Sequence, residues 1–170
     1  VPPVSFESVV SGVMAFSQKR EADFLKLWVE KRKFRIGDSI SYNFLSERDC
    51  HLIILDMTTD GKLIQIFPNR FNSDPLVRAY RIYKILDESM DIELKVTGPS
   101  GTERILALAS ESPFDLFPAQ FGEEQPFFMV KREEQGLLEQ ISRNIQSAKN
   151  LSLFQKQITY SIISESKTSD

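Results

Sequence analysis

The chain has 170 residues, of which 41% are hydrophobic and 26% charged. It is long enough to bury one sizeable core, and its charged fraction is too close to the globular average for the whole chain to be disordered. A net charge of -3 argues against nucleic-acid binding, and a single Cys excludes an intrachain disulfide. No apolar run is long enough to span a bilayer.

The N-terminal segment 1–23 predicts a short helix with Ser5 as its N-cap. Its apolar residues recur at the spacing of one helix face. These residues are Phe6, Val9, Val10, Val13 and Met14. A strand is expected next, at residues 24–30.

Three strands are expected between residues 39 and 67. Residues 39–44 alternate between apolar and polar, which predicts a strand with one buried face. Residues 50–57 are apolar on both faces apart from Asp56, as is typical of a central strand covered on both sides. Asp60–Gly61 is a strong hairpin signal and leads into a returning strand at 63–67.

The second half of the chain predicts further strands and one long helix. Residues 77–86 are a loosely patterned strand, and residues 91–109 predict a second hairpin. An apolar stripe over residues 132–149 predicts an amphipathic helix that covers the sandwich or its open end, or else forms a docking surface for an adjoining domain. Alternation at residues 158–162 predicts a last strand.

These elements favour a mainly β fold: one β-sandwich of about seven strands, immunoglobulin-like in character, with an N-terminal helix and a helix in the C-terminal half. We expect a single domain over residues 1–170. It comprises an N-terminal helix or linker at 1–23, the sandwich at 24–163 and a frayed tail at 164–170.

Several motifs together resemble a known bacterial family. They are Phe34–Ile40, Cys50–Leu55, Asp60–Lys62, Phe67–Asn69 and Val96–Glu103. Over roughly residues 25–110 the sequence resembles the family called domain of unknown function 4384. The resemblance implies a small accessory β-sandwich without a known reaction, found beside kinase-like, caspase-like or envelope domains, and it supplies no catalytic residues.

Turn chemistry alone explains the Gly and Asn residues of these motifs, with Asn69 in a left-handed or an Asx-turn position. Cys50 and His51 are adjacent, so on a regular strand they point to opposite faces and cannot form a catalytic dyad. Since His51 is the only His, no other imidazole can serve a nucleophile, and a structural zinc site lacks ligands.

Carboxylate chemistry is the remaining possibility for a reaction or a metal. A hydrolase would need two carboxylates that converge in one pocket, and the doublets Glu123–Glu124 and Glu133–Glu134 are typical of solvated faces. Several aspartates in or near loops suggest a calcium site, although no D-x-D-x-D-G loop is present. These are Asp38, Asp49, Asp56, Asp60 and Asp74. We therefore expect no catalytic residues, no metal ligands and no cofactor.

Two surfaces are candidates for binding. The basic cluster Lys31–Lys33 with Arg35 is either a solvated loop or a contact for an anionic lipid, glycan or protein. The Phe-rich segment 114–128 either plugs the core or forms an exposed patch. The candidate binding residues are Asn69, Arg70, Phe71, Phe117, Phe121 and Phe127.

We predict a non-catalytic module for protein interaction or structural support, whose partner is another protein or an adjoining domain. The alternative is a domain that binds a glycan, a small molecule or calcium through the loops at 69–74 and 114–128. The chain begins at Val1 rather than Met. We therefore expect either that a signal peptide, a lipid anchor or another domain was removed, or that Val1 marks a cloning boundary. The expected location is the bacterial periplasm, the envelope or outside the cell.

Overall fold

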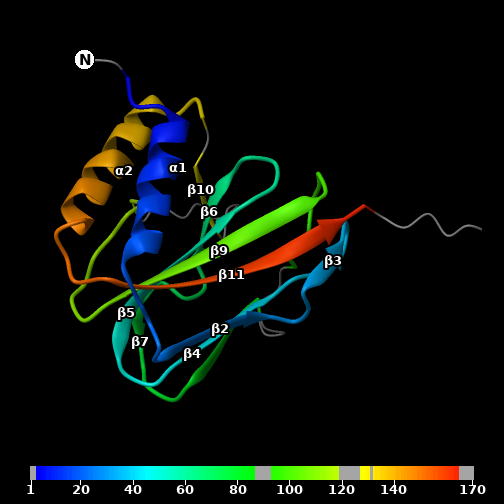
Figure 1. Ribbon diagram of the computed structural model, residues 1–170, viewed down its shortest axis with the longest axis horizontal. Helices are drawn as coiled ribbons and strands as arrows, with labels where there is room; N and C mark the ends of the chain where they lie inside the picture. The colour runs from blue at the N-terminus through cyan, green and yellow to red at the C-terminus, as the bar shows by residue number, and fades with distance from the viewer. Residues whose placement is uncertain (1–2, 87–92, 119–126, 131, 165–170) are drawn as a thin grey trace, which may run out of the picture.

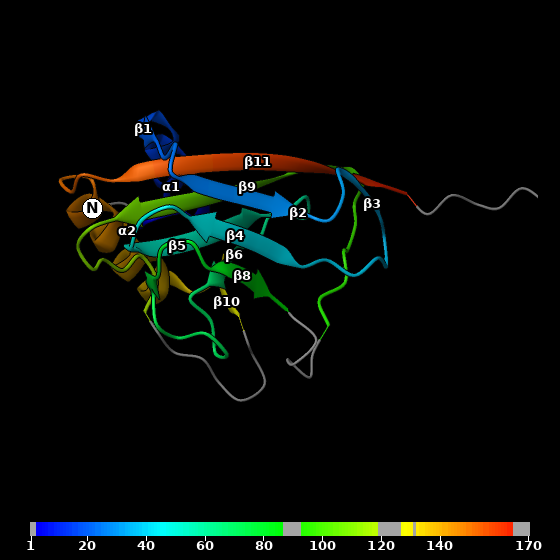
Figure 2. The same ribbon diagram turned by 90° about the horizontal axis from the view of Figure 1, so that it is seen from below.

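The computed structural model describes residues 3–86, 93–118, 127–130 and 132–164. They form three layers (Figures 1 and 2). Two helices lie on one face of an eight-stranded sheet, and a three-stranded sheet packs on its other face. Neither described helix is long and apolar enough to cross a membrane.

The helices are α1 (Phe6–Met14) and α2 (Gln135–Ala148), with a 3-10 helix η1 (Ala15–Gln18) after α1. The larger sheet has the order β1 (Arg20–Glu21), β11 (Phe154–Ile163), β9 (Gly101–Ser110), β5 (Cys50–Met57), β6 (Leu63–Phe67) and β10 (Phe128–Val130). Two short strands join it at the side, β3 (Lys33–Arg35) on β11 and β7 (Leu76–Val77) on β5. The smaller sheet has the order β2 (Leu25–Val29), β4 (Tyr42–Ser46) and β8 (Ile82–Ile85).

The larger sheet is buried on both faces, as its central strand β5 shows. Ile53 and Leu55 belong to the cluster under the helices, whereas Leu52 and Ile54 belong to the cluster under the smaller sheet. Successive side chains of a strand alternate between faces, so one apolar run supplies both clusters. This confirms the predicted central strand.

Both predicted helices are present. Ser5 caps α1, because its Oγ accepts a hydrogen bond of 3.0 Å from the backbone N–H of Ser8. A Cβ atom at Gly12 would lie 3.3 Å from Ile145, so α1 and α2 approach closely at this point. The buried stripe of α2 includes Leu138 and Ile141, and it covers the larger sheet as predicted.

The expected sandwich of about seven strands is corrected by the structure. The described residues contain eleven strands in two sheets that do not close into a barrel. The larger sheet is mixed, since β1 and β3 pair in parallel with β11, whereas immunoglobulin-like sheets are antiparallel. Short parallel strands from the N-terminal third carry no periodic signal, so the sequence did not reveal them.

One local prediction is also wrong, and the bounds of a second strand are shifted. In place of the second hairpin, β9 pairs with β5 and β11, and Lys95 before it forms an isolated antiparallel bridge with Ser39 before β4. The amide of Ile40 donates to Leu94 O at 3.0 Å, and that of Val96 donates to Asp38 O at 2.8 Å. The strand expected at 39–44 is β4, which runs from Tyr42 to Ser46 and buries Tyr42 and Phe44 between the sheets, while Asn43 on the other side is 9% exposed beside Trp28.

Candidate functional site

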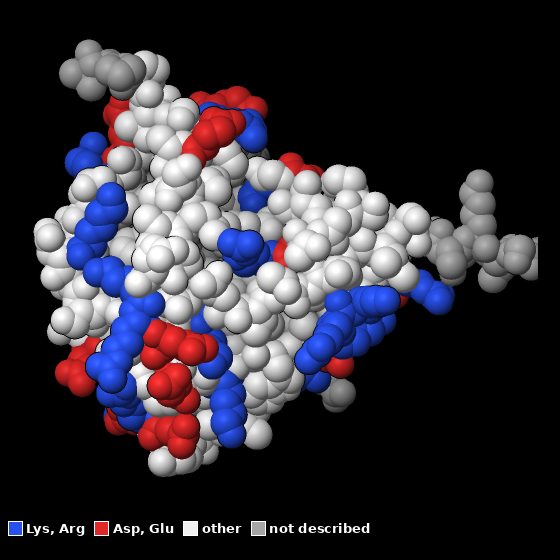
Figure 3. Space-filling model, in the orientation of Figure 1, with Lys and Arg blue, Asp and Glu red and all other residues white. Residues whose placement is uncertain are grey.

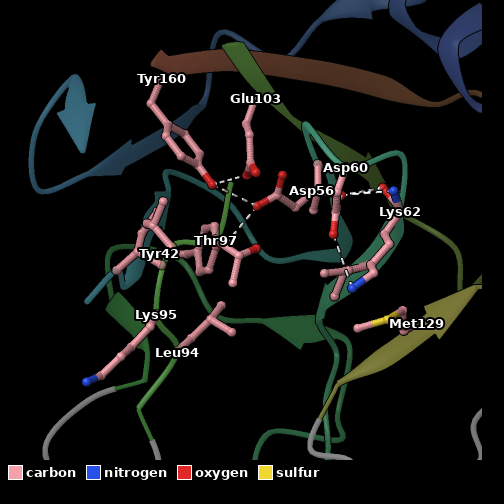
Figure 4. Close-up of a pocket in the computed structure, with 14 residues that line it drawn as sticks. Tyr42, Asp56, Asp60, Lys62, Leu94, Lys95, Thr97, Glu103, Met129 and Tyr160 are labelled. Atoms are coloured by element: carbon pink, nitrogen blue, oxygen red, sulfur yellow. Dashed lines mark hydrogen bonds and ion pairs between the residues drawn. The ribbon is translucent and has the colours of Figure 1, made fainter. Parts of the chain in front are cut away.

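Two carboxylates lie inside the core between the sheets. Asp56 on β5 is 2% exposed and Glu103 on β9 is 4% exposed. Tyr160 on β11 is directly opposite Glu103, and Asp56 is opposite Ile105, which places it diagonal to Glu103. Strand alternation therefore turns all three polar side chains toward the smaller sheet, as Figure 4 shows.

The hydroxyls of two tyrosines donate hydrogen bonds to these carboxylates. Asp56 Oδ2 accepts hydrogen bonds from Tyr42 at 2.8 Å and from Tyr160 at 3.1 Å. The Tyr160 hydroxyl also contacts Glu103, whose other oxygen accepts from the Thr59 amide at 3.3 Å. One phenolic proton can serve only one carboxylate at a time. Asp56 Oδ1 is buried and has no hydrogen-bond partner among the described residues.

Burial decides the protonation of this group. Loss of hydration, followed by the charge of Glu103, raises the pKa of Asp56 well above its usual range. Burial and the charge of Asp56 likewise raise the pKa values of Tyr42 and Tyr160. Both phenols therefore remain hydrogen-bond donors at neutral pH, and Asp56 keeps its proton at a higher pH than a free aspartic acid would.

These side chains form the floor of a cavity of about 150 Å³, which we call the acid pocket. Its walls are apolar. They are formed by Ile40, Ile64, Leu94, Val96 and Met129. Asp60 and Lys62 also line it, paired at 3.2 Å, and both side chains are partly open to solvent. The pocket thus runs from solvent to a buried acidic floor.

The calcium site that the sequence left open as an alternative is not assembled among the described residues. Within the described residues, no group of three or more His, Cys, Asp or Glu side chains could hold a metal ion. Asp56 was grouped with loop aspartates in that prediction, and this was wrong, because it lies inside strand β5. Its isolation in an otherwise apolar strand was a signal for a buried acid, but its meeting with Glu103 depends on strand register.

The neighbours Cys50 and His51 have separate partners. Cys50 is buried and its Sγ lies 3.7 Å from Ser46 Oγ, and this burial raises the pKa of the thiol. His51 Nδ1 lies 3.2 Å from the carbonyl oxygen of Glu111. The two side chains therefore do not combine into a nucleophile and a base.

The predicted binding residues are only partly brought together. Arg70 and Phe117 line one groove of about 430 Å³, and Phe71 is 40% exposed. Phe117 is itself buried and stacks on Phe128 at 5.2 Å, so it anchors the core. Phe127 is half-buried against the core, and Phe121 lies outside the described residues.

Asn69 is a structural residue of the turn after β6. It is fully buried, its Nδ2 donates to Ile66 O at 2.8 Å, and its Oδ1 accepts from the amides of Phe71 and Asn72 at 2.8 and 2.9 Å. This is the Asx-turn of the two predicted conformations. Asn69 is thus not available to a ligand.

Replacement of Asn69 by Ala is expected to lower the free energy of unfolding by about 2–4 kcal/mol, because it leaves buried backbone groups without partners. Urea denaturation measures this loss. A loss below about 0.5 kcal/mol, the usual effect of a surface substitution, would show that the turn does not depend on this side chain.

The outward side of the smaller sheet, which we call the outer face, carries exposed apolar residues. Strand register places Lys26, Leu45 and Ile82 in one row, and Trp28 and Lys84 in the next. Trp28 is 39% exposed and Ile82 is 65% exposed. Further basic side chains gather around β3 in Figure 3. Local sequence pattern does not reveal this face, because the face depends on the pairing of β2 with β4 and of β4 with β8.

Comparison with known proteins identifies a family for part of the chain. Residues 33–113 match the family described as "Domain of unknown function (DUF4384)", which confirms the resemblance. No curated protein and no solved structure matches the chain. The matched segment runs from the start of β3 to three residues beyond the end of β9 and so includes both buried carboxylates of the acid pocket.

Proposed function

Since residues 33–113 match a family of unknown function, we propose from the geometry that the chain is a non-catalytic module that binds an acidic partner protein through the outer face. The module would serve a bacterial envelope or secreted protein. The observation that carries the proposal is the exposure of Trp28 and Ile82 on the two edge strands, β2 and β8, of the three-stranded sheet.

The chemistry of the outer face suits a protein partner. Exposed aromatic and aliphatic side chains with a polar rim are typical of the centre of an interface, where Trp is enriched among the residues that dominate affinity. Lys26 and Lys84 flank Trp28 and Ile82, and the basic run Lys31–Lys33 follows β2. These positive charges favour an acidic partner and accelerate its association.

The acid pocket does not suit the two-carboxylate hydrolysis that the sequence left open. Glycosidase carboxylates stand at least about 5 Å apart, on two sides of the bond that is cleaved. The hydroxyl of Tyr160 contacts both Asp56 and Glu103 and so lies where the bond to be cleaved would have to lie. The hydroxyls of Tyr42 and Tyr160 also take acceptor positions that a base would need for an attacking water.

Ligand binding through the loops is the alternative function. The groove that contains Arg70 and Phe117 favours it. However, Asn69 and Phe117 have structural roles in that region, so the outer face has the better support.

Capture of a partner from the native host, followed by measurements with both purified proteins, tests the proposal. The substitution Ile82→Lys is expected to weaken the complex at least about ten-fold, since it places a charge in the apolar centre. Phe71→Ser is the matched control, because it removes an exposed ring at the predicted loop surface and should leave the affinity unchanged.

The partner should be acidic, and added salt should slow its association. A complex that survives Ile82→Lys and is lost with Phe71→Ser would transfer the function to the loop surface. A complex that is insensitive to both substitutions would contradict the outer face as the site.

A further inference from the structure

The strand β11 has one edge that is only partly covered. On one side β9 pairs with it along Phe154–Ile162. On the other side β1 pairs with Phe154–Gln155 and β3 pairs with Ser161–Ile163, so β1 and β3 flank the two ends of β11 (Figure 2). Between β1 and β3 the chain leaves the larger sheet to form β2. Among the described residues, 156–160 therefore have no strand partner on this side. Proteins usually cover such edges, because an open edge pairs readily with another chain.

Two residues of the uncovered stretch direct their backbone polar groups outward. The amide of Ser161 donates to Arg32 O at 2.8 Å on this side. Every second residue of a strand directs its N–H and C=O groups to the same side, so those of Gln157 and Thr159 also face away from β9. Within the described part of the chain, neither residue has a backbone partner there. The Gln157 carbonyl and the Thr159 amide can therefore bond to both backbone groups of one residue in an added strand.

The uncovered stretch lines a groove of about 400 Å³, which we call the edge groove. Ile158 and Thr159 form one wall, and Leu27, Trp28 and Val29 form the other. The second wall belongs to β2, which is itself an edge strand of the smaller sheet. Thr159 and Trp28 are both exposed. The edge groove is thus open to solvent, and through Trp28 it is continuous with the outer face.

The charge of the edge groove is positive. Lys31 and Arg32 line it next to β3, and no acidic side chain of the described residues does. Lys31 is paired with Asp38 at 2.7 Å. The exposed side chain of Arg32 forms no ion pair within the described ranges. A free guanidinium beside an open strand edge favours a carboxylate.

We propose that the edge groove binds a short extended segment of the acidic partner, which adds a strand to β11 between β1 and β3. This inference rests on the proposed function and names the part of the partner that is recognised. Main-chain hydrogen bonds to Gln157 and Thr159 hold the segment, as in other cases of strand addition. A carboxylate of the segment pairs with Arg32, and an apolar side chain lies against Trp28 and Ile158.

The length of the gap limits the segment. The amide of Ala22 donates to Gln155 O at 2.7 Å at one end, and Arg32 O accepts from Ser161 at the other. Three residues of the added strand, opposite 157–159, therefore fit between Ala22 and Arg32, over a distance of about 10 Å. The segment runs parallel to β11, as β1 and β3 do. The rest of the partner leaves the groove on its solvent side.

NMR titration of the full chain with a capped pentapeptide of alternating valine and glutamate tests the proposal. We expect saturable shifts of the Gln157 and Thr159 amides, and at least about ten-fold slower hydrogen exchange of the Thr159 amide in the complex. The same peptide with lysine in place of glutamate should bind at least about ten-fold more weakly. A peptide methylated at its backbone nitrogens cannot donate to Gln157 O, and it should lose at least about ten-fold in affinity.

Thr159→Pro removes the outward N–H, and an edge position without a partner tolerates proline. This variant should bind the pentapeptide at least about ten-fold more weakly. Arg32→Gln should weaken binding about three-fold, the usual effect of an exposed ion pair. Arg78→Gln is its matched control, because Arg78 is an exposed cation paired with Asp49, and it should leave binding unchanged. If Thr159→Pro does not fold, the methylated peptide answers the same question on the wild-type protein.

Strand addition and the outer face can fail separately. Failure of the wild-type protein to bind the pentapeptide, equal affinity for the methylated peptide, or shifts that leave Gln157 and Thr159 unaffected would each overturn strand addition. With the purified partner, a complex that is lost in Ile82→Lys and kept in Thr159→Pro would also overturn it and retain the outer face. The reverse result would support strand addition and remove the outer face as the site.

Discussion

Replacing Asp56 with Asn is expected to raise the free energy of unfolding at neutral and alkaline pH by about 1–3 kcal/mol. The wild-type protein must either bury an ionised carboxylate or hold a proton that the unfolded chain releases. The amide of Asn keeps an acceptor for Tyr42 and Tyr160 and adds a donor for Glu103. Its neutral form avoids both costs.

The sign of the effect follows from the raised pKa of Asp56 in the folded state. The contribution of protonated Asp56 to the free energy of unfolding is fully present below the pKa that Asp56 has in the unfolded chain. It is lost by about 1.4 kcal/mol per pH unit as the pH rises from that value to the pKa of Asp56 in the folded protein. Urea denaturation across the pH range should show the two proteins converge in acid and diverge toward alkaline pH. A variant that is less stable at every pH would contradict a proton-holding Asp56.

Asp38→Asn should change the free energy of unfolding with a pH dependence opposite to that of Asp56→Asn. The side chain of Lys31, followed by the amide of Arg35, lowers the pKa of Asp38. Its contribution is therefore present above the unfolded pKa and is lost as the pH falls through the folded pKa. This exposed variant should be less stable than wild type at neutral pH and equal to it in strong acid.

Phe44→Ala is expected to cost about 3–5 kcal/mol of unfolding free energy, the usual loss for a buried Phe. Phe44 is fully buried on β4 and joins the two sheets. Its ring lies 5.1 Å from that of Phe67 on β6 and stacks at 5.0 Å on that of Tyr83 on β8. Removal of the Phe44 ring leaves a cavity between β4, β6 and β8. These strands are held in place by their sheets and cannot move together to fill it.

Chemical denaturation measures this loss, and Phe71→Ala is the control. Phe71 is 40% exposed, so its removal should change stability by less than about 1 kcal/mol. Equal effects of the two substitutions would show that the smaller sheet does not pack on the larger one through this aromatic cluster.

Local pattern predicted much of this fold. The run 50–57 indicated a strand covered on both faces, and the structure buries Ile53 and Leu52 on opposite sides of it. Asp60–Gly61 predicted the hairpin, where Gly61 has a φ of 80°. These signals lie within a few residues of each other, so no tertiary contact is needed to read them.

Pairing between distant strands could not be predicted in this way. The alternation before β9 suggested a hairpin, yet the partners of β9 are β5 and β11. The acid pocket depends on the same long-range register, since Asp56, Glu103 and Tyr160 come from three separate strands. The sequence shows each acidic residue singly. Only the strand register shows that Asp56 and Glu103 lie side by side in the core.

Asp56 keeps its proton at the floor of the acid pocket because burial and the charge of Glu103 raise its pKa. The ¹³C chemical shift of the Asp56 carboxyl carbon, followed by NMR as the pH is varied, reports this proton. We expect the carboxyl to remain protonated at pH values well above the usual range for aspartic acid. An ordinary titration near the pKa of free aspartic acid would show that Asp56 is ionised in the core and holds no proton.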